Sequence, residues 1–136
     1  MQTNLDLQRN IEYLWNNQEE LINKESQNII TTALGLLDNG TVRVAERQDG
    51  LWKVNDWLKK VVLMSFKISN NRHIKAGDLN FYDKVDSKFL GYTSENFKNL
   101  KTRIVPSATV RFGSYLGKNT VLMPSFVNIG AYVGNG

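Results

Sequence analysis

The chain has 136 residues, of which 41% are hydrophobic and 22% are charged, and its formal net charge is +4. These values are typical of a globular protein and exclude a disordered one. The chain has no cysteine, which excludes disulfides, thiol nucleophiles and cysteine-ligated metals. Lys and Arg are scattered along the chain, so nucleic-acid binding is not favoured.

Two helices are predicted between Met1 and Gly40. Apolar residues recur there every three to four positions, as one face of an amphipathic helix requires. The members of this pattern are Leu7, Ile11, Leu14, Trp15 and Ile22, and then Ile30, Ala33, Leu34 and Leu37. The pair Asn39-Gly40 predicts the end of the second helix, because glycine adopts the left-handed conformation without a Cβ penalty.

A β-hairpin is predicted in the segment TVRVAERQDGLWKVN, residues 41–55. Val42 and Val44 alternate with polar or small residues, and Trp52 and Val54 do the same on the second strand. Asp49-Gly50 lies between the two runs and favours the tight turn that joins antiparallel strands.

A helix is predicted in NDWLKKVVLMSFKI, with Asn55 as its N-cap. Apolar side chains cover most of its circumference, and Lys60 and Lys67 mark one polar face. A helix with this pattern is expected to be buried.

Residues 69–100 give weaker patterns. NNRHIKAGD is predicted as a loop and FYDKV as a short strand, and Ser94 is predicted as the N-cap of a short helix that ends at Leu100. His73, the only histidine of the chain, lies in the predicted loop beside Arg72. We expect it to be a surface residue and not a catalytic base.

From Ile104 the chain repeats every six positions: IVPSAT, VRFGSY, LGKNTV, LMPSFV, NIGAYV. This period predicts a parallel β-helix built from hexapeptides, with three hexads in each coil. Two apolar columns are expected to line its interior, and small residues such as Gly117 and Gly130 to occupy its corners. The first column is Ile104, Val110, Leu116 and Leu122, and the second is Tyr115, Val121, Val127 and Val133.

The predicted fold is therefore an α+β N-terminal domain, residues 1–103, followed at residues 104–136 by the first coils of a β-helix. Each coil buries its faces only against its neighbours, so such repeats need about three units. Residues 104–136 form fewer than two coils. We expect the chain to be the front part of a longer protein, or its last coil to be covered by a partner.

Three segments carry a resemblance to a known family: DNGTVRVAERQDGLWKVNDWLKKVVLMSFKI, FYDKV and RIVPSATVRFGSYLGKNTVLMPSFVNIGAYV. From about Asn28 onward the sequence resembles the bacterial tetrahydrodipicolinate N-succinyltransferases, and TVLMPSFVNIGAYV is the most specific part of the match. The segment from Met1 to Glu25 matches the family only in helical character.

The resemblance implies a homotrimer whose subunits carry a left-handed parallel β-helix, with active sites between neighbouring helices. It implies succinyl transfer from succinyl-CoA, a co-substrate, to the amino group of L-2-amino-6-oxopimelate in lysine biosynthesis by the diaminopimelate route. No permanently bound cofactor and no metal are implied, because the thioester is already activated.

One functional residue of the family carries over by resemblance. The substrate-binding arginine of the family stands before the β-helix in a motif that matches Arg103-Ile104-Val105-Pro106. Arg103 is therefore expected to bind a substrate carboxylate, for which a guanidinium is well suited. Arg111 is a weaker second candidate, expected to point outward. The residues that bind CoA are unknown.

The catalytic aspartate of the family would follow residue 136, so no catalytic residue is assigned in this chain. Residues 104–136 contain no Asp, Glu or His. Since attack by an amine needs a proton acceptor, the chain from Met1 to Gly136 alone is expected to be inactive.

Two alternatives remain open at this stage: a non-catalytic trimerisation module, and a relative that uses acetyl-CoA. No apolar run approaches the ~18 residues of a membrane span, and the N-terminus lacks a signal-peptide core. No membrane or nucleic-acid partner is expected, and a cytoplasmic location is predicted.

Overall fold

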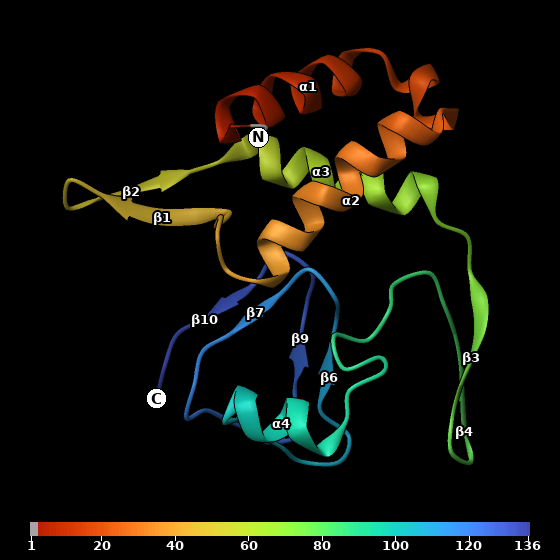
Figure 1. The fold of residues 1–136 in the computed structure, drawn as a ribbon, viewed down its shortest axis with the longest axis vertical. Helices are drawn as coiled ribbons and strands as arrows, with labels where there is room; N and C mark the ends of the chain where they lie inside the picture. Colours follow the sequence, from red (N-terminus) through yellow and green to blue (C-terminus); the bar gives the residue numbers. More distant parts are fainter. Residues whose placement is uncertain (1–2) are drawn as a thin grey trace.

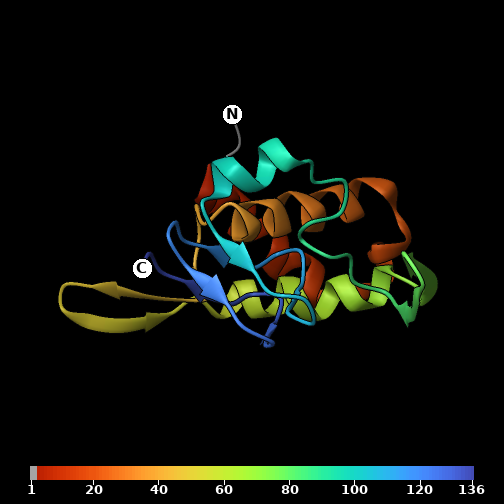
Figure 2. The ribbon, with the colours of Figure 1, turned by 90° about the horizontal axis from the view of Figure 1, so that it is seen from below.

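The structure, a computed structural model, describes residues 3–136. Helices α1, α2 and α3 form one end of the molecule, and the short strands of the C-terminal third form the other (Figure 1). Seen from below, the β1–β2 hairpin extends away from both parts (Figure 2). Helices and small two-stranded sheets are thus present in the N-terminal region, as predicted.

The predicted helical pair is confirmed, with one difference in its connection. Helix α1 spans Asn4–Asn16, a 3-10 helix η1 spans Gln18–Ile22, and α2 spans Lys24–Asp38. Ile22 was expected on the buried face, but it is 85% exposed, and Leu21 is buried in its place. The 3-10 helix η1 has fewer residues per turn than an α-helix, so the residues after Asn17 are rotated relative to the face that the α-helical period predicts.

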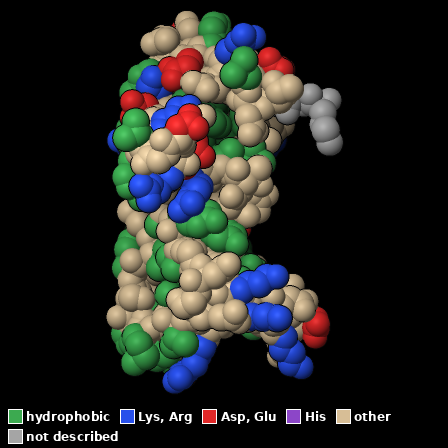
Figure 3. Space-filling model, turned by 90° about the vertical axis from the view of Figure 1, so that its left-hand side faces the viewer, with side chains coloured by type: hydrophobic (Ala, Val, Ile, Leu, Met, Phe, Trp, Pro, Cys, Tyr) green, Lys and Arg blue, Asp and Glu red, His purple; other side chains and the backbone are tan. Residues whose placement is uncertain are grey.

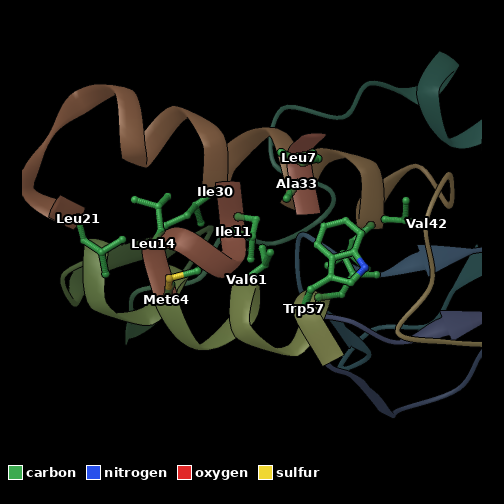
Figure 4. Packing of buried hydrophobic residues seen from close by; sticks show 12 residues of the cluster. Leu7, Ile11, Leu14, Leu21, Ile30, Ala33, Val42, Trp57, Val61 and Met64 are labelled. Carbon is green, nitrogen blue, oxygen red and sulfur yellow. The ribbon is translucent and has the colours of Figure 1, made fainter. Parts of the chain in front are cut away.

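Helix α3 (Asp56–Ile68) completes the helical core. Figure 4 shows side chains of α1, α2 and α3 directed toward one another. The fully buried members of this cluster are Ile11, Ile30, Ala33, Leu58, Val61 and Met64. The expectation that α3 is buried nearly all round is wrong on one side, because Leu63 is 51% exposed.

The predicted hairpin is confirmed as β1 (Ala45–Gln48) paired antiparallel with β2 (Leu51–Val54). Both turn residues, Asp49 and Gly50, have positive φ, as this tight turn requires. The predicted N-cap of α3, Asn55, makes no side-chain cap. Its amide instead donates to the Arg43 carbonyl and to the Glu46 carboxylate.

Residues 69–100 differ from the prediction. The segment predicted as a loop contains β3 (Arg72–Ala76), which pairs antiparallel with β4 (Leu79–Asp83). The predicted helix is α4 (Ser94–Leu100), but its N-cap is Thr93, the preceding residue. The Thr93 hydroxyl accepts from the Asn96 backbone, and the Asn96 side chain accepts from the Thr93 backbone.

The C-terminal third consists of six very short strands: β5 (Arg103–Ile104), β6 (Thr109–Val110), β7 (Tyr115–Leu116), β8 (Val121–Leu122), β9 (Phe126–Val127) and β10 (Tyr132–Val133).

These strands form three parallel pairs, β5 with β8, β6 with β9, and β7 with β10. Arg103 lies opposite Val121, and Thr109 lies opposite Phe126. Each strand is therefore paired with the strand that follows it by about three hexads, as one coil of a hexapeptide repeat requires.

The first apolar column is confirmed as interior, and the second is corrected. Val110, Leu116 and Leu122 are buried in one cluster. Val121, from the second column, is 53% exposed. Val127 is buried, but it continues the first column, because the step from Leu122 to Val127 is one position shorter than a hexad. The inward positions are thus Ile104, Val110, Leu116, Leu122, Val127 and Val133.

The two predicted corner glycines have different roles. Gly130 has φ +86°, so it is a corner in the left-handed region. Gly117 is required for another reason, since a Cβ there would lie 2.5 Å from the backbone carbon of Gly134 in the next layer.

Phe89 and Leu100 precede residue 104, but they pack against the buried residues of the paired strands, such as Val110 and Leu116. The division of the chain into domains 1–103 and 104–136 stays a prediction.

Candidate functional site

Arg103 lies at the start of the paired strands and is exposed. Its backbone N–H donates to the Thr120 carbonyl at 3.0 Å, which holds β5 against the next layer. Ile104, the next residue, packs against the interior cluster, so Arg103 is on the outer side of the strand. Within residues 3–136, no side-chain hydrogen bond or ion pair holds its guanidinium. The predicted role in binding a carboxylate stays a prediction.

The backbone under Arg103 is fixed by a buried pair of threonines. Thr102 is 8% exposed and Thr120 is 5% exposed. Both hydroxyls donate to the Gly117 carbonyl, at 3.2 Å and 3.0 Å, and they lie 3.1 Å from each other. This arrangement gives Arg103 a rigid base from which its long side chain extends.

Arg111 follows the inward-facing Val110, so its side chain points away from the interior of the paired strands and toward the β3–β4 hairpin. Its guanidinium donates to Asp83 of β4 at 3.0 Å and to the Asn128 amide oxygen at 3.2 Å. It also lies 5.4 Å from the ring centre of Phe126. Arg111 therefore links the β3–β4 hairpin to the paired strands.

The contact with Arg111 affects the pKa of the Asp83 carboxyl. Burial alone would raise its pKa, but the backbone N–H groups of Lys84 and Val85 and the charge of Arg111 outweigh burial and lower the pKa of Asp83 below its usual value. Asp83 and Arg111 line a cavity of about 500 Å³ between the hairpin and β6, together with apolar side chains such as Phe81 and Phe126.

His73 lies on β3 and is exposed. Its Nε2 is 2.7 Å from the Asn80 amide oxygen on the paired strand. This position agrees with a surface residue. Within residues 3–136 no set of three or more His, Cys, Asp and Glu side chains could hold a metal ion.

The structure contains a mostly buried ion pair that the sequence did not predict. Lys88, whose side chain is 5% exposed, lies 2.9 Å from the Asp38 carboxylate at the end of α2. It also donates to the Asp38 and Ser114 carbonyls, each at 2.8 Å. The same carboxylate oxygen accepts from the Gly113 backbone at 2.9 Å. This cluster joins the helical end of the molecule to the paired strands.

The buried cluster borders a cavity of about 360 Å³ lined by Tyr92 and Phe112. Burial raises the pKa of Tyr92, and the charge of Asp38 adds to the effect. Neither Lys88 nor Tyr92 stood out in the sequence, because a lysine in a weakly patterned segment resembles any surface lysine.

Comparison with known proteins gives a consistent result. The family model described as "Tetrahydrodipicolinate N-succinyltransferase N-terminal" matches residues 6–68. A 2,3,4,5-tetrahydropyridine-2,6-dicarboxylate N-succinyltransferase of Acinetobacter baylyi is 62% identical over 104 residues, 76% of this chain and 38% of the relative. The enzyme of the same name from Dechloromonas aromatica is 51% identical over 130 residues, 93% of this chain and 48% of the relative.

The chain spans less than half the length of these relatives. The class that the matches define is that of the N-acyltransferases. Within that class, the chain matches the N-terminal part of the tetrahydrodipicolinate N-succinyltransferase family. Among the helices in residues 3–136, none combines the length and the apolar character needed to cross a membrane.

Proposed function

We propose that the full-length protein transfers the succinyl group of succinyl-CoA to the amino group of L-2-amino-6-oxopimelate, in the diaminopimelate route to lysine. The observation that carries the proposal is the 51% identity over 130 residues to a relative named for this transfer, since this match includes nearly the whole chain. In the reaction the amine attacks the thioester carbonyl, the amide bond forms, and CoA leaves as the thiol.

The proposal includes an assembly and a location. The parallel strand pairs, each made across about three hexads, agree with the first turns of a left-handed β-helix. We propose that three such subunits form a homotrimer, that Arg103 binds a substrate carboxylate between subunits, and that the enzyme acts in the cytoplasm without a permanently bound cofactor.

The direct test measures CoA release by the purified full-length protein with the ring-opened substrate and either succinyl-CoA or acetyl-CoA. Faster release from succinyl-CoA supports the proposal, and faster release from acetyl-CoA assigns the protein to the alternative donor. A protein that is trimeric by light scattering but releases no CoA from either donor would be an assembly module, and the proposal would fail.

Replacing Arg103 by alanine in the full-length protein is expected to lower kcat/KM for the amine substrate by about 10- to 150-fold, or about 1.5–3 kcal/mol, because a charge-assisted hydrogen bond is lost. Steady-state kinetics measure the change. Arg103→Lys keeps the charge but loses the planar fork, so it is expected to restore part of the activity.

A matched control is Arg47→Ala, which removes an exposed arginine from the distant β1–β2 hairpin and is expected to leave the kinetics unchanged. If Arg103→Ala behaves like this control, Arg103 is not part of the substrate site.

The chain from Met1 to Gly136 alone is expected to release no CoA. Residues 104–136 contain no carboxylate or histidine side chain that could accept the proton of the attacking amine. The same CoA-release assay, run at high concentration of this chain, tests the expectation. Release above the background hydrolysis of succinyl-CoA would place the proton acceptor among residues 1–103.

A further inference from the structure

Charge is distributed unevenly along this chain. All 13 Asp and Glu residues lie at or before Glu95, whereas five basic residues follow it. Figure 3 shows Lys and Arg side chains toward the end of the molecule where α4 lies in Figure 1. The segment after Glu95 therefore carries only positive side-chain charges, although the chain as a whole has a net charge of only +4.

Four of these basic residues surround one corner of the paired strands. Lys98 lies in the last turn of α4, and Lys101 ends that helix with φ 54°. The Asn119 backbone donates to the Lys101 carbonyl at 2.8 Å, so Lys118 lies in the adjacent layer at the same corner. Arg103 follows shortly after Lys101. We call Lys98, Lys101, Arg103 and Lys118 the cationic corner.

The charges of the cationic corner are available to a ligand. All four residues are exposed. Within residues 3–136, the ion pairs involve other basic residues, such as Arg72, Lys88 and Arg111. Backbone hydrogen bonds join Asn119 to Lys101 and Arg103 to Thr120, so the chain segments that carry Lys101, Arg103 and Lys118 lie in adjacent layers, about 4.8 Å apart.

We propose that the cationic corner captures a small multiply charged anion and guides it to Arg103. The proposal rests on the proposed function, in which both substrates are such anions: one is a dicarboxylate and the other carries nucleotide phosphates. Lys98, Lys101 and Lys118 act at a distance through the field, while Arg103 makes the contact. Clustered charges of one sign raise the local concentration of an oppositely charged ligand, and salt weakens this effect.

Nucleic acid is the less suitable ligand for this corner. A protein bound to a duplex commonly neutralises several phosphates along an extended surface. The cationic corner instead concentrates its four charges around the end of one short helix and one turn, a size that suits a small molecule.

The test uses the full-length protein and the double variant Lys101→Gln/Lys118→Gln, which keeps Arg103. The control is Lys24→Gln/Lys53→Gln, which removes two exposed lysines from α2 and β2. Calorimetry measures the dissociation constants of pimelate, a non-reactive dicarboxylate, and of CoA, at 20 mM and at 500 mM salt. A duplex DNA oligonucleotide is the third ligand.

At 20 mM salt the double variant is expected to bind pimelate, CoA or both about three- to ten-fold more weakly than the wild type, and at 500 mM salt the difference is expected to vanish. Weakening of pimelate alone identifies the dicarboxylate as the captured anion, and weakening of CoA alone identifies the nucleotide phosphates. The control variant is expected to match the wild type.

The proposal is overturned if the double variant binds both small anions like the control at both salt concentrations. It is also overturned if the wild type binds the DNA duplex more tightly than either small anion. These binding measurements need no catalytic turnover. If the protein releases no CoA but the double variant still shows the salt-dependent loss of affinity, the proposed function fails and the cationic-corner proposal stands.

Discussion

The Lys88→Met variant is expected to lose about 3 kcal/mol of unfolding free energy, because it breaks a mostly buried ion pair and leaves the Asp38 carboxylate with the Gly113 N–H as its remaining partner. Lys88 has three oxygen acceptors within 2.9 Å, two of them on Asp38 and one on Ser114. Methionine fills similar space but donates to none of them. Urea unfolding followed by tryptophan fluorescence measures the loss.

Two further variants show whether the loss comes from the pair itself. Lys75→Met removes an exposed lysine from β3 and is expected to change stability by less than about 0.5 kcal/mol. The double variant Lys88→Met/Asp38→Asn is expected to lose less than the sum of its two single variants, since the orphaned charge is gone. A loss below about 1 kcal/mol for Lys88→Met would contradict the buried contact.

Replacing Leu58 by alanine is expected to cost about 2–5 kcal/mol of unfolding free energy, through lost burial and the cavity that remains. Leu58 is fully buried in the cluster shared by α1, α2 and α3. Leu63 on the same helix is 51% exposed and provides a matched control. Leu63→Ala is expected to cost well under half as much in the same unfolding experiment, and equal losses would mean that α3 is covered on both sides.

The elements that the sequence predicted well are those whose apolar spacing is regular. The helices around Ile11, Ile30 and Val61 follow the α-helical period, and each of these residues is in the core. The β1–β2 hairpin followed from Asp49-Gly50, a pair that favours the positive φ angles that both residues adopt. In both cases local chemistry and tertiary packing favour the same structure.

The β3–β4 hairpin could not be predicted in the same way. Strand β3 reads RHIKA, and only Ile74 in it is partly buried, whereas the other four residues are exposed. A strand with little burial has no apolar alternation, and its polar residues resemble those of a loop. Its structure depends on pairing with β4, which lies later in the chain.

The six-residue repeat was predicted from the sequence, but the sequence did not show which of its two apolar columns faces the interior. A period of six places two apolar columns in the sequence, and only one of them faces inward. The shortened step from Leu122 to Val127 moves Val127 and Val133 from the apparent second column into the first. A fixed period of six cannot reveal a missing residue of this kind.

For the candidate site, the family resemblance assigned Arg103, and the structure places it on an outer strand position. The contacts of Lys88 with Asp38 and of Arg111 with Asp83 join residues 50 and 28 positions apart. Contacts over such separations leave no local pattern, so neither could have been inferred from the sequence.

The turn after Leu122 is one residue shorter than the equivalent turn in the first layer, which shows where the repeat accommodates a change in length. In the first layer the chain passes from Ile104 to Thr109 through the segment VPSA, with Ser107 at φ 77°. In the second layer it passes from Leu122 to Phe126 through the shorter segment MPS. The strands on either side remain paired, so length variation is absorbed at this turn. One residue inserted between Met123 and Pro124 would restore the length of the first-layer turn, so it is expected to leave β8 paired with β5 and β9 paired with β6.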